Sequence, residues 1–358
     1  MNKDLHGGNI YKFQREGKND ILDYSSNINP LGVPQKFIDI AKESFDKLVN
    51  YPDPYYIELR KKIAEFNSLN MDNIIVGNGA TEILFLYIRA LKPKKVLILA
   101  PCFAEYERAL KSVSANIEYF ELKESDNFYP NIINLKKEIE NNNYDLLLFC
   151  NPNNPTGQFI KLEDIKEIIE TCEKKNTKIF VDEAFIEFIE NWKEKTVSLL
   201  KNKNIFIMRA FTKFFAIPGL RLGYGIGFDD EVLKKMWEEK EPWTVNTFAN
   251  LAGLIMLDDK EYIEKSEKWI LEEKKFMYEE LSKFQNIKVY KTECNFILIK
   301  LSNITSESLR EKMIERNILI RDASNFKFLD YHFVRLAIKD RKSNLKMLET
   351  LTGFVEYK

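Results

Sequence analysis

The chain has 358 residues, with 54 Lys or Arg against 55 Asp or Glu, so its formal net charge is -1. Its 45% hydrophobic content excludes disorder as the main state, and the balanced charge gives no global attraction to nucleic acid or anionic membranes. We therefore expect neither as a partner. Four dispersed cysteines and two histidines favour no metal site or disulfide framework, and no signal peptide is evident, so we expect a cytoplasmic protein.

Short apolar runs alternate with amphipathic stretches between residues 70 and 230. The runs lie at 74–76, 96–99, 117–120, 146–149, 178–181 and 205–208. Because they lack period-two polarity, they indicate strands covered on both faces, and so an α/β fold with a mostly parallel sheet. Ligands of such sheets gather at the carboxyl ends of the strands.

The pattern changes after residue 255. A long charged helix is predicted over 261–283, followed by strands at 295–300 and 333–339 with a helix near 306–316 between them. We expect this part to form a smaller α+β domain. The predicted division is a large domain over 35–250, with 1–34 and 251–358 forming the small one.

Two loops that follow predicted strands are candidates for ligand binding. The turn Gly77-Asn78-Gly79-Ala80-Thr81-Glu82 opens a helix whose first amides could hold a phosphate, although a plain tight turn stays open. In the loop 150–157, two Asn-Pro pairs hold carboxamides at the end of the sheet. A rigid turn without a ligand is the alternative there.

Two charged groups stand in apolar surroundings. Asp182 ends an apolar run, and an ionised side chain in such surroundings needs a paired charge or has a functional role. Lys213 lies among Phe211, Phe214 and Phe215, and desolvation by these rings would favour the free amine that acts as a Schiff-base nucleophile. A second cation, Arg221, follows eight residues later.

The motifs N-N-P-T-G, D-E-A, T-K and G-L-R-L-G-Y, in this order and spacing, resemble the pyridoxal 5'-phosphate (PLP) enzymes of fold type I. The resemblance to this aspartate aminotransferase superfamily covers essentially the whole chain. It implies a large domain built on a mostly parallel seven-stranded sheet, a smaller α+β domain, and PLP as cofactor.

The resemblance also implies roles for individual residues. Lys213 corresponds to the lysine that binds the cofactor and shuttles protons, and Asp182 to the partner of its pyridine nitrogen. Asn154 corresponds to the donor to the ring phenolate, and Phe103 to the aromatic residue that stacks on the ring. The implied phosphate contacts are Ala80, Thr81, Thr212 and Arg221.

Three further positions carry implications of the same resemblance. Tyr51 resembles a tyrosine that reaches the phosphate of the neighbouring subunit's cofactor, which would make the active unit a homodimer. Phe185 stands where many relatives have Tyr, so one phenol hydrogen bond would be missing. Ala210 stands where relatives often have Ser or Thr, which leaves Thr212 as the nearby hydroxyl.

The segments 6–9, 23–32, 214–219, 242–246 and 320–326 resemble the threonine-phosphate decarboxylases of cobalamin synthesis, with histidinol-phosphate aminotransferases as close cousins. Both handle a phosphorylated amino compound, so a second anion site is expected. Arg335 corresponds to the arginine for the substrate carboxylate. The expected phosphate site is made of Arg321, His6, Gly7 and Gly8, with Asn27 and Asn29 shaping the pocket. A surface ion pair for Arg321 and a terminal tail for His6 are the alternatives.

The reaction depends on which bond to Cα stands perpendicular to the cofactor ring, and a sequence does not show that angle. We expect decarboxylation of L-threonine O-3-phosphate to 1-aminopropan-2-yl phosphate, with histidinol-phosphate or another amino transfer as the alternative. A non-catalytic PLP-binding protein is a further alternative. It is disfavoured because Lys213, Asp182, Asn154 and Arg221 are all present.

Overall fold

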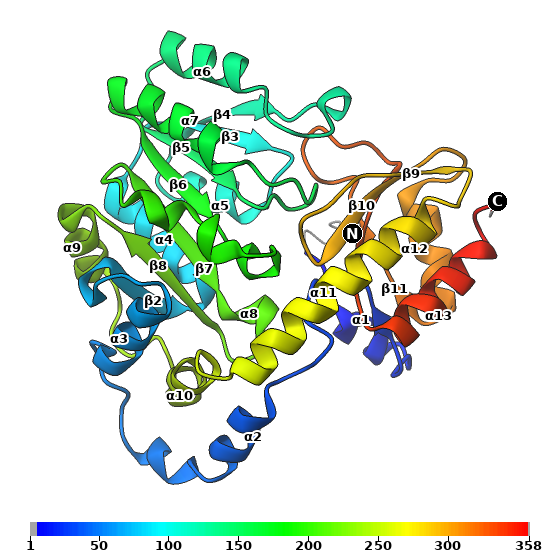
Figure 1. The fold of residues 1–358 in the computed structure, drawn as a ribbon, viewed down its shortest axis with the longest axis horizontal. Coiled ribbons are helices and arrows are strands. Elements are labelled where there is room, and N and C mark those ends of the chain that lie inside the picture. The colour runs from blue at the N-terminus through cyan, green and yellow to red at the C-terminus, as the bar shows by residue number, and fades with distance from the viewer. Residues whose placement is uncertain (1–5, 357–358) are drawn as a thin grey trace.

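The computed structural model describes residues 6–356 and contains a seven-stranded sheet in the order β2-β8-β7-β6-β5-β3-β4 (Figure 1). Only β8 runs against its neighbours β2 and β7, so the predicted mostly parallel α/β sheet is confirmed. The strands are β2 (Ile74–Asn78), β3 (Lys95–Ala100), β4 (Asn116–Glu121), β5 (Leu146–Cys150), β6 (Lys178–Asp182), β7 (Ile205–Ala210) and β8 (Leu222–Gly227).

Helices cover both faces of this sheet, because neighbouring residues of each buried strand point to opposite sides. In β3, Leu97 and Leu99 belong to one apolar cluster, whereas Val96 and Ile98 belong to another. The first cluster includes α6 (Ile132–Asn141) and α7 (Leu162–Lys174). The second includes α4 (Gly79–Leu91), α5 (Glu105–Lys111) and α9 (Asp230–Glu239). The result is a three-layer α/β/α arrangement.

A second, antiparallel sheet has the order β12-β13-β10-β9. Its strands are β9 (Ile287–Val289), β10 (Phe296–Leu301), β12 (Arg321–Asp322) and β13 (Phe333–Ala337). Near the N-terminus, β1 (Leu22–Asp23) pairs in parallel with β11 (Ile318–Leu319), which joins the first segment of the chain to its last third. The predicted α+β character of the C-terminal part is confirmed, and the domain boundaries at residues 35 and 250 stay a prediction.

The remaining helices are α1 (Ile10–Arg15), α2 (Gln35–Lys42), α3 (Ile57–Phe66), α8 (Phe211–Phe214), α10 (Thr247–Met256), α11 (Lys260–Leu281), α12 (Ser306–Glu315) and α13 (Arg341–Thr352). Several begin at a side chain that accepts a hydrogen bond from a first-turn amide, as Asn246 does for α10 and Asp259 for α11. The long α11 passes from the large sheet to the small one (Figure 1). None of the helices within 6–356 is long and apolar enough to cross a membrane.

Candidate active site

A cavity of about 460 Å³ lies at the carboxyl ends of the central strands, where Cys150, Asp182 and Ala210 end β5, β6 and β7. Arg321 and Arg335 of the small sheet line it as well, so residues of both sheets bound the cavity. It brings together most of the predicted site, namely His6, Gly7, Asn27, Ala80, Thr81, Phe103, Asn154, Asp182, Thr212, Lys213, Arg221, Arg321 and Arg335. Gly8 lines a smaller neighbouring cavity, which shares His6, Gly7 and Arg321 with the first.

Lys213 lies in the one-turn helix α8, directly after the central strand β7. Burial lowers the pKa of its amine to about 8, and the positive charges of Arg335 and Arg221 act in the same direction. Asn29 does not line the cavity as predicted; instead its backbone N–H donates to the Lys213 carbonyl (3.1 Å) and its side chain to the Phe214 carbonyl (2.8 Å). Asn29 therefore holds the backbone that carries the lysine.

Asp182 presents its carboxylate to the cavity while only 5% exposed. Burial raises its pKa to about 6, although two donors oppose this change. The Tyr106 hydroxyl donates to Oδ2 at 2.6 Å, and the Ala184 N–H donates to Oδ1 at 2.9 Å. Tyr106 was missed by the sequence analysis, because it lies on α5 without a motif of its own. These bonds fix the carboxylate where a cationic ring nitrogen would be its natural partner.

The turn before α4 leaves space for an anion only because Gly79 has no side chain. Its φ is +76°, and a Cβ there would lie 2.4 Å from Nη2 of Arg221. Gly223 allows equally close contact, because its Cβ would lie 2.3 Å from the backbone nitrogen of Ala80. The start of α4 and the Arg221 guanidinium thus come together at one end of the cavity, an arrangement that suits a phosphate group.

Arg335 is buried, and its guanidinium connects β13 with Asn154 of the large sheet's loop and with Ser25 near the N-terminus. Nη1 donates to Oδ1 of Asn154 at 2.5 Å, and Nη2 donates to the Ser25 carbonyl at 2.6 Å. Its Nε has no hydrogen-bond partner among residues 6–356, and the same holds for Oδ1 of Asn27. Burial and the neighbouring Arg321 lower the pKa of Arg335 to about 9. A buried guanidinium with an unused donor calls for an anion.

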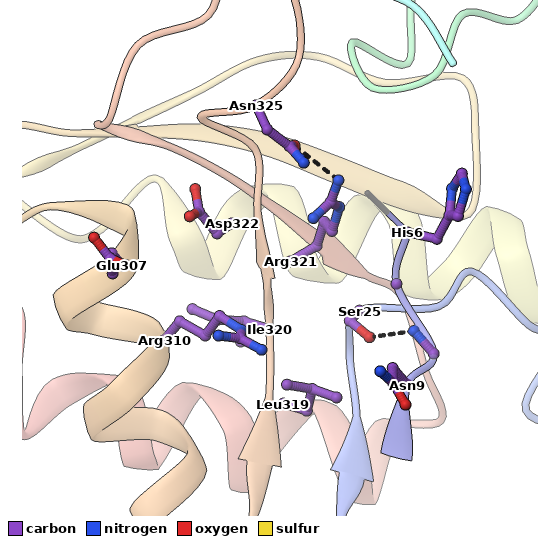
Figure 2. Close-up of a pocket in the computed structure, with 12 residues that line it drawn as sticks. His6, Asn9, Ser25, Glu307, Arg310, Leu319, Ile320, Arg321, Asp322 and Asn325 are labelled. Carbon is purple, nitrogen blue, oxygen red and sulfur yellow. Dashed lines mark hydrogen bonds between the residues drawn. The ribbon is translucent and has the colours of Figure 1, made fainter. Parts of the chain in front are cut away.

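Arg321 faces Arg335 directly across the β12–β13 ladder. It is 7% exposed, donates to Oδ1 of Asn325 at 2.8 Å, and lies over the Phe326 ring at 5.2 Å from its centroid. Figure 2 shows it between Asn325 and the N-terminal arm at the smaller cavity. Arg321 is therefore buried within the site and is not a surface side chain.

The N-terminal arm, residues 6–9, closes one side of the cavity. His6 Nε2 lies 2.9 Å from Oε1 of Glu105, and the Gly8 N–H donates to Oγ of Ser25 at 2.8 Å. Gly7 is packed so tightly that a Cβ would lie 2.0 Å from the Ser25 carbonyl oxygen. The arm is therefore fitted to Ser25, and the alternative of a loose tail at His6 is not what the structure has.

Tyr51 lies outside the cavity, 81% exposed, with its ring centroid 4.8 Å from that of Trp243. Its predicted contact with a neighbouring subunit stays a prediction. Phe185, the predicted departure from Tyr, is buried at the cavity wall and packs edge-on against Phe296 at 5.1 Å. Ala210 also lines the cavity and offers no hydroxyl there.

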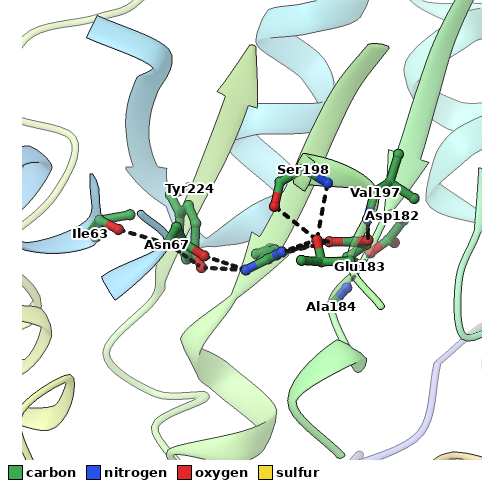
Figure 3. A network of polar contacts seen from close by, with 10 residues as sticks. Ile63, Asn67, Asp182, Glu183, Ala184, Val197, Ser198 and Tyr224 are labelled. Carbon is green, nitrogen blue, oxygen red and sulfur yellow. Dashed lines mark hydrogen bonds and ion pairs between the residues drawn. The ribbon is translucent and has the colours of Figure 1, made fainter. Parts of the chain in front are cut away.

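Behind Asp182, the next residue of the chain forms a buried ion pair (Figure 3). Glu183 and Arg209 are both fully buried, with Nη2 of Arg209 2.8 Å from Oε2 of Glu183. Asn67 and Thr196 complete the network by accepting further hydrogen bonds from the guanidinium. The pair joins the end of β6, which carries Asp182, to β7, which leads to Lys213.

The charged groups of the cavity suit a ligand that carries several negative charges. Its cationic side chains outnumber its carboxylates; the cations are Lys213, Arg108, Arg221, Arg321 and Arg335, and the carboxylates are Asp182 and Glu105. The glycine-shaped phosphate turn, the buried Asp182 and the orphan donor of Arg335 together fit PLP with an anionic substrate beside it. Among the described residues, no cluster of His, Cys, Asp or Glu could hold a metal ion.

Comparison with known proteins defines the class. Residues 19–351 match the family model for aminotransferase class I and II, and the chain belongs to this family. Members of the family are PLP-dependent enzymes, and the chain is one of them. The predicted fold type I architecture and its cofactor are thereby confirmed.

Individual relatives narrow the class. The chain is 43% identical to a Caldanaerobacter subterraneus subsp. tengcongensis protein provisionally assigned as a threonine-phosphate decarboxylase, over 98% of this chain and 94% of that protein. It is 34% identical to the threonine-phosphate decarboxylase of Salmonella typhimurium, over 97% and 95%. The crystal structure of the histidinol-phosphate aminotransferase from Clostridium acetobutylicum has a TM-score of 0.88 and 39% identity, over 93% of this chain and 98% of that one.

Proposed function

We propose that this protein is a PLP-dependent lyase that decarboxylates L-threonine O-3-phosphate to 1-aminopropan-2-yl phosphate, a reaction of cobalamin biosynthesis. The observation that carries the proposal is the pair of buried guanidinium groups, Arg321 and Arg335, on facing positions of one ladder at the cavity. A phosphorylated amino acid has two anionic groups at once, a carboxylate and a phosphate. The decarboxylase relatives support the same substrate.

The cofactor residues follow from the geometry of the cavity. The start of α4 with Ala80 and Thr81, together with Arg221 and Thr212, would hold the phosphate of PLP. Asp182 would hold the ring nitrogen, Phe103 would cover the ring, and Asn154 would donate its amide to the ring oxygen, since its Oδ1 is taken by Arg335. When bound, PLP supplies a conjugated ring that takes up the electron pair left when a bond to Cα breaks.

For the substrate, Arg335 binds the carboxylate, and Arg321 with His6 and the Gly7 amide binds the phosphate. The Gly8 amide, which the sequence had placed in the same site, donates to Ser25 Oγ instead. Asn27 also lines the cavity, and its Oδ1 has no hydrogen-bond partner among residues 6–356, so it is a candidate acceptor for a substrate donor.

Lys213 acts on protons in this site. Its lowered pKa makes the neutral amine more accessible than in an ordinary lysine, and this amine would hold the cofactor aldehyde when PLP is bound. The same amino group is placed to carry a proton to Cα of the substrate. Burial of the surrounding groups limits the access of water to the reacting carbon.

A histidinol-phosphate aminotransferase is the second candidate, favoured by the 39% identical crystal structure. Histidinol phosphate carries a phosphate but no carboxylate, so Arg335 would serve only the amino acid that exchanges the amino group. Under the decarboxylase proposal, both arginines engage one substrate molecule in a single turnover.

The test is to give the purified PLP-loaded protein L-threonine O-3-phosphate without any keto acid, and to follow CO2 and the product amine by mass spectrometry. Many turnovers of CO2 with equal amounts of the amine phosphate are expected. Amino transfer from histidinol phosphate that requires a keto acid, with no CO2 from phosphothreonine, would establish the second candidate instead.

We further propose a homodimer in which Tyr51 of one subunit reaches the partner's cofactor. Support comes from the exposed apolar side chains between α2 and α3, namely Phe45, Leu48, Val49, Tyr51 and Tyr55, which would be costly to leave in water. A sedimentation mass of one chain at micromolar concentration would contradict it. The compartment that we propose is the reducing cytoplasm, in keeping with four free cysteines.

A further inference from the structure

Glu105 is a carboxylate at the wall of a cavity that is built for anions, and no part of the proposed chemistry uses it. We propose that Glu105 is a positioning residue that holds the His6 imidazole in place for the phosphate of the substrate. The inference rests on the proposed function, because it names a determinant of specificity within the same site.

The side chains of His6 and Glu105 are in direct contact, and Glu105 is much more buried than His6. His6 Nε2 lies 2.9 Å from Oε1 of Glu105, whose side chain is 9% exposed while that of His6 is 45% exposed. The buried carboxylate thus reaches from the first turn of α5 to a ring that stands at the mouth of the cavity. The His6 ring also packs on Phe103, with centroids 5.4 Å apart.

The backbone of the arm is fixed independently of this contact. Ser25 accepts the Gly8 N–H, and its carbonyl leaves no room for a side chain at Gly7. The same carbonyl accepts from Arg335. Because Ser25 anchors the backbone, the orientation of the His6 ring is what remains for Glu105 to determine.

A carboxylate beside a site for anions weakens anion binding unless its charge is compensated. On its own, Glu105 would repel the phosphate of the substrate, and its second oxygen lies 3.5 Å from Arg108 Nη1, at the limit of a hydrogen bond. In the proposed complex His6 donates Nε2–H to Glu105 and, because a protonated ring donates from both nitrogens, Nδ1–H to a phosphate oxygen. The pair therefore presents a donor to the substrate while it compensates the buried carboxylate.

The decisive experiment is a double-mutant cycle of Glu105→Ala and His6→Gln in the PLP-loaded enzyme. Glu105→Ala should raise the KM for phosphothreonine about tenfold, the size of a lost hydrogen bond to a charged group, with kcat and PLP affinity nearly unchanged. In the His6→Gln background the same substitution should have no further effect. Additive losses in the two variants, or a loss confined to kcat, would overturn the proposal.

The matched control is Glu107→Ala on the same helix. Glu107 is 43% exposed, pairs with Lys111 at 2.5 Å and does not line the cavity, so its removal should leave the KM unchanged. Glu105→Gln keeps an acceptor oxygen, so it should raise the KM less than Glu105→Ala does. If Glu107→Ala raised the KM as much as Glu105→Ala, the rise would follow from the loss of any negative charge on α5. That result would overturn the specific role of Glu105.

A second readout does not depend on turnover. The chain has only two histidines, so the imidazole NMR signals that remain in the His332→Gln variant of the PLP-loaded protein belong to His6. The product 1-aminopropan-2-yl phosphate, which keeps the phosphate and is not decarboxylated, should shift the His6 signals, and Glu105→Ala should require about tenfold more of it for the same shift. Identical titrations of the two proteins would overturn the role of Glu105, whereas absence of CO2 release from the wild-type enzyme would overturn the proposed function itself.

Discussion

Arg321 and Arg335 are cross-strand partners: they occupy the same rung of the β12–β13 ladder, and both side chains are buried at the candidate active site. Like charges on facing positions destabilise a sheet pair, and here Arg321 contributes to the lowered pKa of Arg335. Two guanidinium groups this close favour the binding of anions beside them. This relationship gives the first prediction.

Arg335→Ala should raise the KM for phosphothreonine about a hundredfold, because it removes a buried charged donor from the substrate carboxylate. Its effect on PLP affinity should be much smaller. Steady-state kinetics and a PLP titration measured on the same preparation decide the matter. Equal losses in both would argue that Arg335 serves the cofactor through Asn154 instead.

Gly79→Ala should weaken PLP binding about tenfold, since its Cβ would force the Arg221 guanidinium away from the phosphate turn. Gly32→Ala is the control: its φ is also positive, at +74°, but its Cβ would meet no atom within 4 Å. The control should cost only about 1 kcal/mol of stability and leave PLP affinity unchanged. If both variants bind PLP alike, the steric argument is wrong.

Capture of PLP by the cofactor-free protein should speed up as pH rises, with a midpoint near pH 8 and a plateau above it. The reason is that burial and neighbouring cations lower the pKa of Lys213 to about 8, so the neutral amine predominates above that pH. Stopped-flow absorbance in the visible range measures the rate. A rate that still climbs steeply towards the ordinary lysine value of 10.5 would contradict the assignment, and Lys213→Ala should show no visible band.

Equilibrium PLP affinity should fall as pH drops through about 6, because burial raises the pKa of Asp182 to about 6 and protonation below that removes the charge opposite the ring nitrogen. Tyr106→Phe removes a donor that lowers this pKa, so its midpoint should lie at higher pH. The comparison of the two midpoints cancels the titration of the PLP phosphate itself. Coincident midpoints would show that Asp182 does not control the profile.

Arg209→Met should destabilise the fold by about 3 kcal/mol, because it leaves the Glu183 carboxylate buried without its cation. Adding Glu183→Met should cost less than the sum of the two single changes, since the unpaired charge is then gone. Urea unfolding of the cofactor-free proteins measures both. Additive losses would indicate that the two side chains do not act as a pair.

Much of the architecture could be predicted because short apolar runs that alternate with amphipathic stretches, and motifs at the ends of the strands, are local signals. The exception in the large sheet is β8, whose sequence Leu222–Gly227 alternates glycine with larger residues. There the glycines are needed for close packing, since a Cβ on Gly225 would lie 2.3 Å from the Phe206 ring. The short strands β11 and β12 were missed because two residues leave no period to detect.

The candidate site shows the same division between local and distant signals. Lys213, Asp182 and Asn154 stand in motifs, and the structure places all three at one cavity. Tyr106 and Glu105 lie on α5, and their partners are distant in the sequence. Tyr106 contacts Asp182, which is 76 positions away, and Glu105 contacts His6, which is 99 positions away. Only the three-dimensional fold brings such partners together; the one local hint is that Glu105 and Tyr106 follow the predicted stacking residue Phe103 by two and three positions.

The pairing of Arg321 with Arg335 also acts as a molecular ruler. Facing residues of an antiparallel ladder have Cα atoms about 4.5–5.5 Å apart, and residues two places along are correspondingly farther. Under the proposed function, this spacing would limit how far apart the carboxylate and the phosphate of a substrate can lie. An arginine two residues away on β12 or its flanks would lie on the same face, and we expect it to favour a longer substrate while Arg335 keeps its bonds to Asn154 and Ser25.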